Sequence, residues 1–450
     1  MSGFEASRRA FLGLAPAVGT LTLGGLDRVL AAVRALGPAA ANDPLAAAAD
    51  EEFWREVQES FDVDRSLVNL NNGGVSPSPR VVMDALRRHL EFSNGAPCYT
   101  MWRILEPQIE TVRQKLAREL GCDSEEVAIT RNASESLETV IFGIPLERGD
   151  EIVATEQDYP RMLSAYRQRE KRDGVKLNLL SYRSPAPPAA DIVRLYADAI
   201  GPRTKLLHVS QITFTTGEIL PVREICALGR AKGIPVIVDG AHAFAQFPFR
   251  RDDLDCEYYG ATLHKWLMAP IGTGLLYVKK ERIPSLWPLF ASENPTSGDI
   301  RKFEEIGTHP AANHQAIAEA LAFHEGIGRE RKAARLRYLR DRWVDRAKEL
   351  PGVTIRTSLE PGRSCAIASA SFETLDHEKL IGHLFDKHRI IVTSIGVGLG
   401  PAAADGGPAT LSGPNSWKGI RVTPSVYTTV DEVDHFADVL ERAVKNGLPA

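Results

Sequence analysis

Six short apolar runs, separated by stretches of helical character, constrain the fold of this chain more than any other feature. Continuous apolar runs are typical of strands that are buried on both faces of a parallel sheet. The stretch 222–232 illustrates the separators, because Pro221 precedes it and Gly233 follows it, the order expected at the two ends of a helix. The pattern predicts an α/β fold. The predicted strands are 127–130, 151–154, 206–210, 235–239, 258–262 and 274–278.

Composition and spacing exclude several classes of protein. The 450 residues carry 54 Lys and Arg against 58 Asp and Glu, whereas nucleic-acid-binding proteins normally carry a basic excess. Five cysteines without a CxxC pair suit neither a disulfide scaffold nor a structural zinc site, although buried thiols and a single bridged pair both stay open. His377 and His383 lack the i, i+4 spacing of a helical zinc site. We expect no nucleic-acid partner and no metal.

The N-terminus is similar to a bacterial export signal. Arg8 and Arg9 are followed by an uncharged apolar stretch that runs to Leu26, and small residues follow at 39–41. This order is typical of the twin-arginine signal. Residues 1–41 are therefore predicted to be a signal peptide that sends the protein to the periplasm or out of the cell, with an uncleaved leader helix as the alternative. No later segment is long and apolar enough to predict a membrane span.

The rest of the chain divides into three predicted segments. A helix-rich stretch at 315–350 connects a large domain, residues 81–315, to a small domain, residues 316–450. Residues 42–80 are predicted to pack on the small domain. The loop 396–413, rich in Gly, Pro and Ala, interrupts the small domain, and we interpret it as a mobile lid.

Two side chains suited to catalysis follow predicted strands. Asp239 ends one strand, and Lys265 comes three residues after the end of the next. Ligands of open parallel sheets bind beyond the carboxyl ends of the strands. Such a carboxylate is a metal ligand, a helix cap or the partner of a protonated ring nitrogen, and an isolated lysine is usually an ordinary surface residue. Together, however, the two favour a Schiff-base lysine with an aspartate that holds a pyridinium proton.

The stretch 236–278 resembles the core signature of the class V aminotransferase family, which comprises fold-type I enzymes that depend on pyridoxal phosphate. Asp-Gly-Ala-His at 239–242 and His-Lys-Trp at 264–266 are most similar to the isopenicillin N epimerase-like branch. The resemblance extends from about Leu70 to the end of the chain. It implies a large domain with a mostly parallel seven-stranded sheet between helices, a smaller α+β C-terminal domain, pyridoxal 5'-phosphate as cofactor and an amino acid as substrate.

The resemblance also implies roles around the cofactor ring. Lys265 matches the lysine that holds the cofactor as a Schiff base, and Asp239 matches the partner of its pyridine nitrogen. His242 matches the Gln or His that reaches the ring hydroxyl. Tyr159 stands where many relatives have a histidine stacked on the ring, and tyrosine offers a larger face for stacking. Without the family context, Tyr159 is equally a core residue.

A further set of residues is implied to hold the phosphate. Ala133 and Ser134 open a helix, where free N–H groups meet an anion, although Ser134 is equally a simple N-cap. Thr262 matches a second phosphate-binding hydroxyl, and His264, beside the lysine, is assigned to the cofactor as well. Thr308 matches a residue that relatives lend to the neighbouring subunit, which implies a homodimer.

The resemblance assigns substrate binding to two residues. Arg421 occupies the place of the arginine that grips the substrate α-carboxylate, a task that suits the planar guanidinium. A structural salt bridge is the alternative for this residue. Asn72 belongs to a short N-terminal loop that lines the site in relatives. Thr213 and Thr215 are both candidates for another cofactor contact.

These assignments predict an enzyme that acts at Cα of an amino acid through Lys265, either an aminotransferase or an isopenicillin N epimerase-like epimerase. A C–S or β-lyase is an alternative. Cysteine desulfurases carry a nucleophilic cysteine in the loop before the C-terminal arginine, whereas 394–418 contains none and Cys365 lies beyond a predicted strand and helix. A desulfurase is therefore disfavoured. An alternative of another class is an exported binding protein that kept the fold and lost catalysis.

Overall fold

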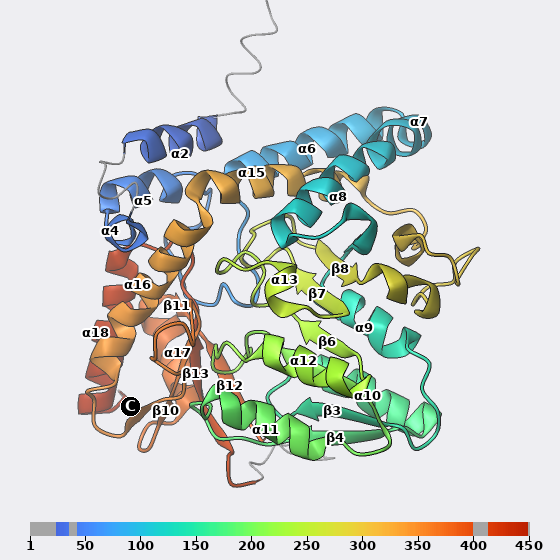
Figure 1. Ribbon diagram of the computed structural model, residues 1–450. Helices are drawn as coiled ribbons and strands as arrows, with labels where there is room; N and C mark the ends of the chain where they lie inside the picture. Colours follow the sequence, from blue (N-terminus) through green and yellow to red (C-terminus); the bar gives the residue numbers. More distant parts are fainter. Residues whose placement is uncertain (1–23, 36–42, 399–412, 449–450) are drawn as a thin grey trace, which may run out of the picture.

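A seven-stranded sheet forms the centre of the molecule (Figure 1), as seen in a computed structural model that describes residues 24–35, 43–398 and 413–448. All neighbouring strands are parallel except the pairs that involve β8, which is antiparallel to both β2 and β7. The predicted mostly parallel sheet is thus confirmed. In spatial order the strands are β2 (Val127–Thr130), β8 (Gly274–Val278), β7 (Tyr258–Thr262), β6 (Val236–Asp239), β5 (Thr204–Ser210), β3 (Glu151–Thr155) and β4 (Lys176–Leu180).

Helices cover both faces of this sheet, which explains why its strands are continuous apolar runs. Residues on one face of the sheet pack with α9 (Ala133–Gly143) and α10 (Pro160–Asp173). Residues on the other face pack with α8 (Glu106–Leu120), α11 (Ala189–Ala199) and α12 (Val222–Lys232). The predicted helix at 222–232 is confirmed with the same bounds, and Gly233 ends it in the left-handed conformation.

The edge strand β4 is the one strand of this sheet that the apolar pattern missed. Its five residues alternate between exposed and more buried positions, because only one side of an edge strand is covered along most of its length. A search for continuous apolar runs therefore passes over it. Pairing of Glu151 with Lys176 and Thr155 with Leu180 fixes its register on β3.

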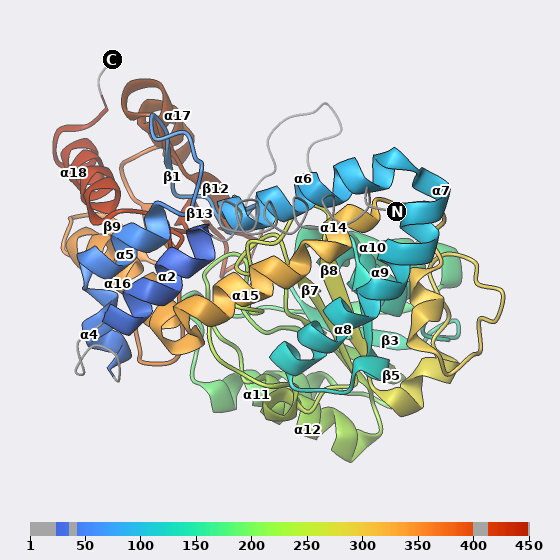
Figure 2. The ribbon, with the colours of Figure 1, turned by 90° about the horizontal axis from the view of Figure 1, so that it is seen from above.

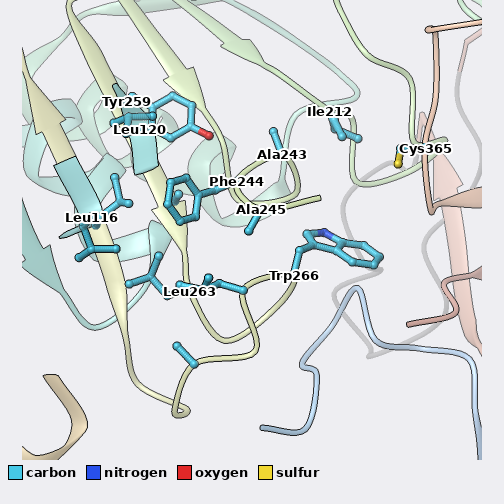
Figure 3. Close-up of a cluster of buried hydrophobic side chains, with 14 of the residues drawn as sticks. Leu116, Leu120, Ile212, Ala243, Phe244, Ala245, Tyr259, Leu263, Trp266 and Cys365 are labelled. Atoms are coloured by element: carbon cyan, nitrogen blue, oxygen red, sulfur yellow. The ribbon is translucent and has the colours of Figure 1, made fainter. Parts of the chain in front are cut away.

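The core extends from the sheet into the loops that carry the candidate site. Figure 3 shows Phe244, Leu263 and Trp266, from the loops after β6 and β7, beside Leu116 and Leu120 of α8. All five side chains are buried. These loops are therefore held by apolar packing from below, which fixes the polar side chains that they present on the other side.

Long helices cross one side of the large domain (Figure 2). Helix α6 (Arg80–Gly95) packs against α14 (Ala311–Gln315) and α15 (Ile317–Ile327), and α15 also packs against α8. Between α6 and α8 the chain forms α7 (Pro97–Thr100) and the π-helical turn η1 (Met101–Leu105). Shorter helical turns are η2 (Ser124–Glu126), α13 (Arg251–Leu254), η3 (Lys280–Ser285) and η4 (Ile300–Glu304).

The C-terminal part is the expected α+β unit. Its antiparallel sheet has the order β12 (Thr393–Val397), β13 (Trp417–Val422), β10 (Ala368–Phe372) and β9 (Val353–Ile355). Helices α16 (Arg329–Ala347) and α18 (Val430–Asn446) pack against each other, and α17 (His377–His388) packs against β12 and β13.

The change of packing partners falls one helix later than the predicted domain boundary at residue 315. Helix α15 packs with helices of the large domain, whereas α16 packs with those of the small domain. Gly328 separates the two helices with a φ of 91°, a left-handed conformation that favours glycine. The uninterrupted helix-like composition of 315–350 hides this break.

The segment before α6 contacts the small domain. Helix α4 (Pro44–Ala48) packs on α16, and α5 (Glu51–Gln58) follows it. Strand β1 (Val68–Asn69) pairs in parallel with β11 (Ile390–Ile391). This pairing carries the loop after β1 to the end of β13, where Asn71 and Thr423 form a bridge.

The predicted leader is described over one helix. Helix α2 (Gly24–Ala35) packs against α15 and α5, and its Val29 is fully buried. Arg8, Arg9, the small residues at 39–41 and most of the predicted lid at 396–413 lie outside the described residues. Within the described ranges, no helix has the length and apolarity to cross a bilayer.

A glycine holds the start of α9 against the sheet, and its replacement tests this packing. A Cβ at Gly274 would lie 2.6 Å from the Cα of Asn132, a backbone atom that cannot turn away. We expect Gly274→Ala to lower the free energy of unfolding by about 1–3 kcal/mol in urea titrations, through overpacking. Gly382→Ala is the matched control, because a Cβ there meets nothing within 4 Å. Equal stability of the two variants would contradict this account.

Candidate active site

A cavity of about 410 Å³ lies at the carboxyl ends of the central strands, and β12 and β13 contribute to its wall. Loops after β6 and β7, the first turn of α9 and the loop after β1 complete its lining. Most of the residues assigned from the sequence meet here. The predicted residues that line it are Ala133, Ser134, Tyr159, Asp239, His242, Thr262, His264, Lys265 and Arg421.

Lys265 extends into this cavity from a tight turn after β7. Leu263 N donates a hydrogen bond to Thr273 O at 3.0 Å and closes the base of the turn. From outside, Ser76 N donates to His264 O at 3.0 Å and the buried Lys332 ammonium donates to Trp266 O. These contacts hold the backbone on both sides of Lys265.

The environment of Lys265 favours its neutral amine. Its side chain is partly open to the cavity, but the protein around the amine removes enough water to lower its pKa to about 8. The negative charge of Asp239 opposes this shift, and the positive charge of Arg421 adds to it. An amine with this pKa is a nucleophile and a proton acceptor near neutral pH.

Asp239 is the last residue of β6 and is 6% exposed. Its Oδ1 accepts a hydrogen bond from Ala241 N at 2.9 Å. Burial raises the pKa of this carboxyl, while His208, the Ala241 hydrogen bond and Lys265 counteract the rise. A buried carboxylate with one hydrogen bond from the protein can accept another from a bound ring N–H group.

His242 follows Asp239 in a loop and contacts the lysine. Its Nε2 lies 3.2 Å from Lys265 Nζ. Burial holds the pKa of His242 well below its ordinary value, and the charges of Lys265 and Arg421 lower it further, so the ring is neutral. Its Nδ1 is buried without a hydrogen-bond partner among the described residues. Such a nitrogen is available to a polar group bound in the cavity.

The turn between β2 and α9 forms an anion cradle. Ala133 N donates to Thr262 Oγ1 at 3.0 Å, which ties the start of α9 to the end of β7 and leaves the Thr262 hydroxyl hydrogen free to donate. The N-cap is Asn132, whose Oδ1 accepts from Glu135 N at 2.9 Å. The reading of Ser134 as the cap is therefore wrong. Ser134 instead lines the cavity within the first turn, where N–H groups favour an anion.

Arg421, on β13, presents a positive charge that no carboxylate neutralises. Its Nη1 donates to Phe214 O at 2.8 Å and its Nη2 donates to Asn71 Oδ1 at 3.2 Å. Burial lowers its pKa to about 10. No carboxylate within the described part of the chain forms an ion pair with it, so the structural salt bridge considered above is not found. A buried guanidinium of this kind suits an incoming carboxylate.

Two predicted site residues lie outside the cavity lining. The Asn72 amide is fully buried and donates to Asn69 O and Thr423 O, while its Oδ1 accepts from Tyr427 OH at 2.7 Å. It therefore shapes the loop, and its neighbour Asn71 contacts Arg421. Thr308 is exposed and does not line the cavity. Its contribution to a neighbouring subunit stays a prediction.

Other residues at the cavity were not assigned from the sequence. Phe214 lines it and packs edge-on against Tyr159, with ring centroids 5.4 Å apart. Ser210, at the end of β5, lines it as well. The two threonine candidates are engaged elsewhere, because Thr213 Oγ1 lies 2.7 Å from Thr216 Oγ1 and Thr215 donates to Gln157. Phe214 stands between them, where a search for hydroxyl groups overlooks it.

Metal and disulfide chemistry are not seen. In the described ranges, no group of three or more His, Cys, Asp and Glu side chains is arranged to hold a metal ion. All five cysteines are described, and all are free thiols, so none forms the bridge that the sequence left open. Burial raises the pKa of Cys226 and Cys256, which suppresses their reactivity as thiolates.

Comparison with known proteins identifies the family. The profile of the Aminotransferase class-V family matches residues 68–436. Isopenicillin N epimerase from Streptomyces clavuligerus is 28% identical over 407 residues, which is 86% of this chain and 98% of that protein. Isopenicillin N epimerase from Amycolatopsis lactamdurans is also 28% identical, over 87% of this chain and 99% of that protein. The chain belongs to the class-V aminotransferase family.

Solved structures show the same fold. The cysteine desulfurase CsdA from Escherichia coli superposes with a TM-score of 0.73 at 21% identity, covering 87% of this chain and 98% of that one. A cysteine desulfurase from Thermococcus onnurineus gives a TM-score of 0.74 at 22% identity, covering 88% and 98%. The fold is therefore that of fold-type I enzymes, and the cofactor of the family is pyridoxal phosphate.

The residues of the cavity fit this cofactor. The Lys265 amine suits its aldehyde, the Asp239 carboxylate its ring nitrogen, and the N-terminus of α9 with Thr262 its phosphate. The unpartnered Nδ1 of His242 is a further polar atom for the ring substituents. The expected cofactor thus agrees with the charges and donors that the structure places here.

The lowered pKa of Lys265 predicts how its reactivity depends on pH. Because this pKa is about 8 rather than 10.5, folded Lys265 is mostly neutral at pH 9, where an ordinary lysine is mostly protonated. Acylation of cofactor-free protein, followed by mass spectrometry of the Lys265 peptide, should therefore rise with pH and reach half its maximum near pH 8. The same peptide in denaturant is the control. Coincident curves for the folded and denatured chain would contradict the assignment.

Proposed function

We propose that this member of the class-V aminotransferase family is an epimerase-like enzyme that removes the Cα proton of an amino acid and returns it. The observation that carries the proposal is the amine of Lys265, which meets Asp239, His242 and Arg421 in one cavity. Alignment with two isopenicillin N epimerases over 98% and 99% of their length supports this branch of the family. Transamination and C–S or β-lyase chemistry are the competing outcomes.

Each residue has a defined task in this reaction. Pyridoxal phosphate, when bound, supplies a ring that accepts electrons. Asp239 binds the ring nitrogen and holds its proton, while Thr262 and the first turn of α9 bind the phosphate. Arg421 binds the substrate carboxylate through its guanidinium and thereby orients the Cα–H bond. The Nζ of Lys265 takes the Cα proton.

The return of the proton is what separates the outcomes. An amine with a pKa of about 8 gives up a proton nearly as readily as it takes one near neutral pH. His242, at 3.2 Å and neutral, is positioned to accept a hydrogen bond from the protonated amine. These two side chains therefore support reversible proton transfer, which epimerisation requires at a single carbon.

A nucleophilic cysteine does not contribute to this site. The family members that are named cysteine desulfurases include a probable one from Mycobacterium leprae, 24% identical over 85% of this chain and 63% of that protein. The interval 394–418 holds no cysteine in this sequence, and Cys365 is fully buried outside the cavity lining. This argues against a reaction through an enzyme persulfide.

Hydrogen exchange at Cα tests the proposed function. The purified holoenzyme is incubated in deuterium oxide with a panel of amino acids, and exchange, inversion, keto acid and sulfide are measured by NMR and colorimetry. We expect exchange with inversion for at least one amino acid. Lys265→Ala should abolish both the cofactor's visible absorption band and exchange, a loss of at least ~10³-fold. Lys171→Ala, on the exposed surface of α10, is the control.

The other outcomes identify the rival reactions. Keto acid formation with conversion of the cofactor to its amine form would assign transamination. Release of sulfide from cystine or cysteine would assign C–S lyase chemistry. A cofactor that binds while no amino acid exchanges would favour the non-catalytic exported binding protein.

We also propose that the protein is exported through the twin-arginine pathway to the periplasm or the outside of the cell. The support is the Arg8-Arg9 pair with the apolar stretch after it. Replacement of both arginines by lysine should retain the protein inside the cell, as measured by fractionation and immunoblotting, with Arg28→Lys as the control. Unchanged export of the double variant would refute the pathway.

Finally, we propose a homodimer in which Thr308 completes the neighbouring site. The exposed Tyr99 and Trp102, near one end of the long α6–α8 layer, support an interface because large exposed aromatic side chains favour association. Sedimentation should give about twice the chain mass of 49.3 kDa. Thr308→Ala should weaken cofactor retention about tenfold without dissociating the dimer, the effect of losing one phosphate hydrogen bond. A monomer that retains the cofactor would contradict this proposal.

A further inference from the structure

A cluster of buried polar side chains lies behind Asp239, on the face of the sheet that α9 and α10 cover. In the parallel pairing of β5 with β6, His208 lies opposite Ile237 and Ser210 lies opposite Asp239. These four residues alternate with the apolar residues that face α12, so their side chains share one face. His208 is therefore one strand away from Asp239 and one pleat deeper in the protein.

His208 is fully buried, and other polar groups surround it. Its Nδ1 lies 3.0 Å from the hydroxyl of Tyr166 on α10, and its Nε2 lies 3.7 Å from Asp158 Oδ1. The Nε2 atom has no hydrogen-bond partner in the described part of the chain. Tyr196 on α11 donates to the backbone carbonyl of His208. The titratable groups that face the imidazole are thus two tyrosines and the carboxylates of Asp158 and Asp239.

Asp158 is bonded in the manner of an ionised carboxylate. Its Oδ1 accepts from Ser210 Oγ at 2.6 Å, and its Oδ2 accepts from Thr155 N at 2.7 Å and from Thr155 Oγ1 at 3.1 Å. All three contacts present hydrogen to the carboxylate, and none needs a carboxyl proton. The side chain is 1% exposed. A buried negative charge therefore lies just behind Ser210, the residue beside Asp239.

Two buried carboxylates this close together oppose each other's ionisation. Burial raises the pKa of Asp239, and the charge of Asp158 raises it further. Among the groups that lower this pKa, His208 has the largest effect, ahead of Lys265. Without a cation at His208, the proton that Asp239 shares with a bound ring would move towards the carboxyl.

We propose that His208 is a positioning residue for the proposed reaction, an imidazolium that pairs with Asp158 and keeps Asp239 ionised, so that the proton stays on the ring nitrogen that Asp239 faces. The inference rests on the proposed function for the place of the cofactor. The electrostatic part concerns this chain alone, because a charge on His208 acts on Asp239 whether or not the cofactor is bound. Electron withdrawal by the ring then depends on a residue that touches neither cofactor nor substrate.

The test uses a neutral replacement and a matched control. His208→Gln removes the charge and keeps a polar side chain, whereas Tyr166→Phe removes the neutral partner of Nδ1 and no charge. In cofactor-free protein, carboxyl NMR should show the proton affinity of Asp239 raised about tenfold or more in His208→Gln. Tyr166→Phe should change it far less. In holoenzyme, nitrogen NMR of labelled cofactor should show the ring nitrogen shifted from the protonated towards the neutral form in His208→Gln alone.

The contrary results are equally specific. If His208→Gln folds with an unchanged Asp239 titration and an unchanged ring nitrogen, the proposal is wrong, whatever the enzyme's reaction. If the variant does not fold, nitrogen NMR of the wild-type imidazole decides, since an imidazolium at neutral pH supports the proposal and a neutral ring overturns it. Failure of the proposed function appears separately, as an absence of Cα exchange in wild-type holoenzyme.

Discussion

The site depends on the placement of a buried amine and a buried carboxylate at the ends of two adjacent parallel strands. The carboxyl ends of such strands meet at one edge of a sheet, so Asp239 and the turn that carries Lys265 are brought together by the topology itself. Burial then makes each group reactive, because it disfavours both charges. The apolar loops beneath, with Phe244 and Trp266, keep these side chains in place.

The local chemistry of the sequence was sufficient for the parts of the fold that are buried on both faces. Strands such as 258–262 and the helix at 222–232 are marked by continuous apolar residues or by end signals within the segment. Strand β4 and the break at Gly328 were missed, because an edge strand is apolar on alternate residues and one glycine does not stand out among helix formers. Those features are determined by the neighbours of the segment rather than by its composition.

The same division applies to the site. Lys265 and Arg421 were recognisable from residue type and order, because their chemistry requires those side chains. The choice between Asn71 and Asn72 was not, because the direction of each amide depends on the bridge to Thr423, more than 350 residues later. The position of His208 was also inaccessible, since its partners come from separate strands and helices. Contacts between distant segments leave no periodic signal in the sequence.

Covalent attachment of the cofactor to one amine is the most direct test of the central claim. Borohydride reduction of the holoenzyme makes the bond between lysine and cofactor permanent, and peptide mapping by mass spectrometry then locates the added mass. The account predicts one cofactor per chain on the peptide that carries Lys265. Attachment to another lysine, such as the buried Lys332, or retention of cofactor without any attachment, would contradict it.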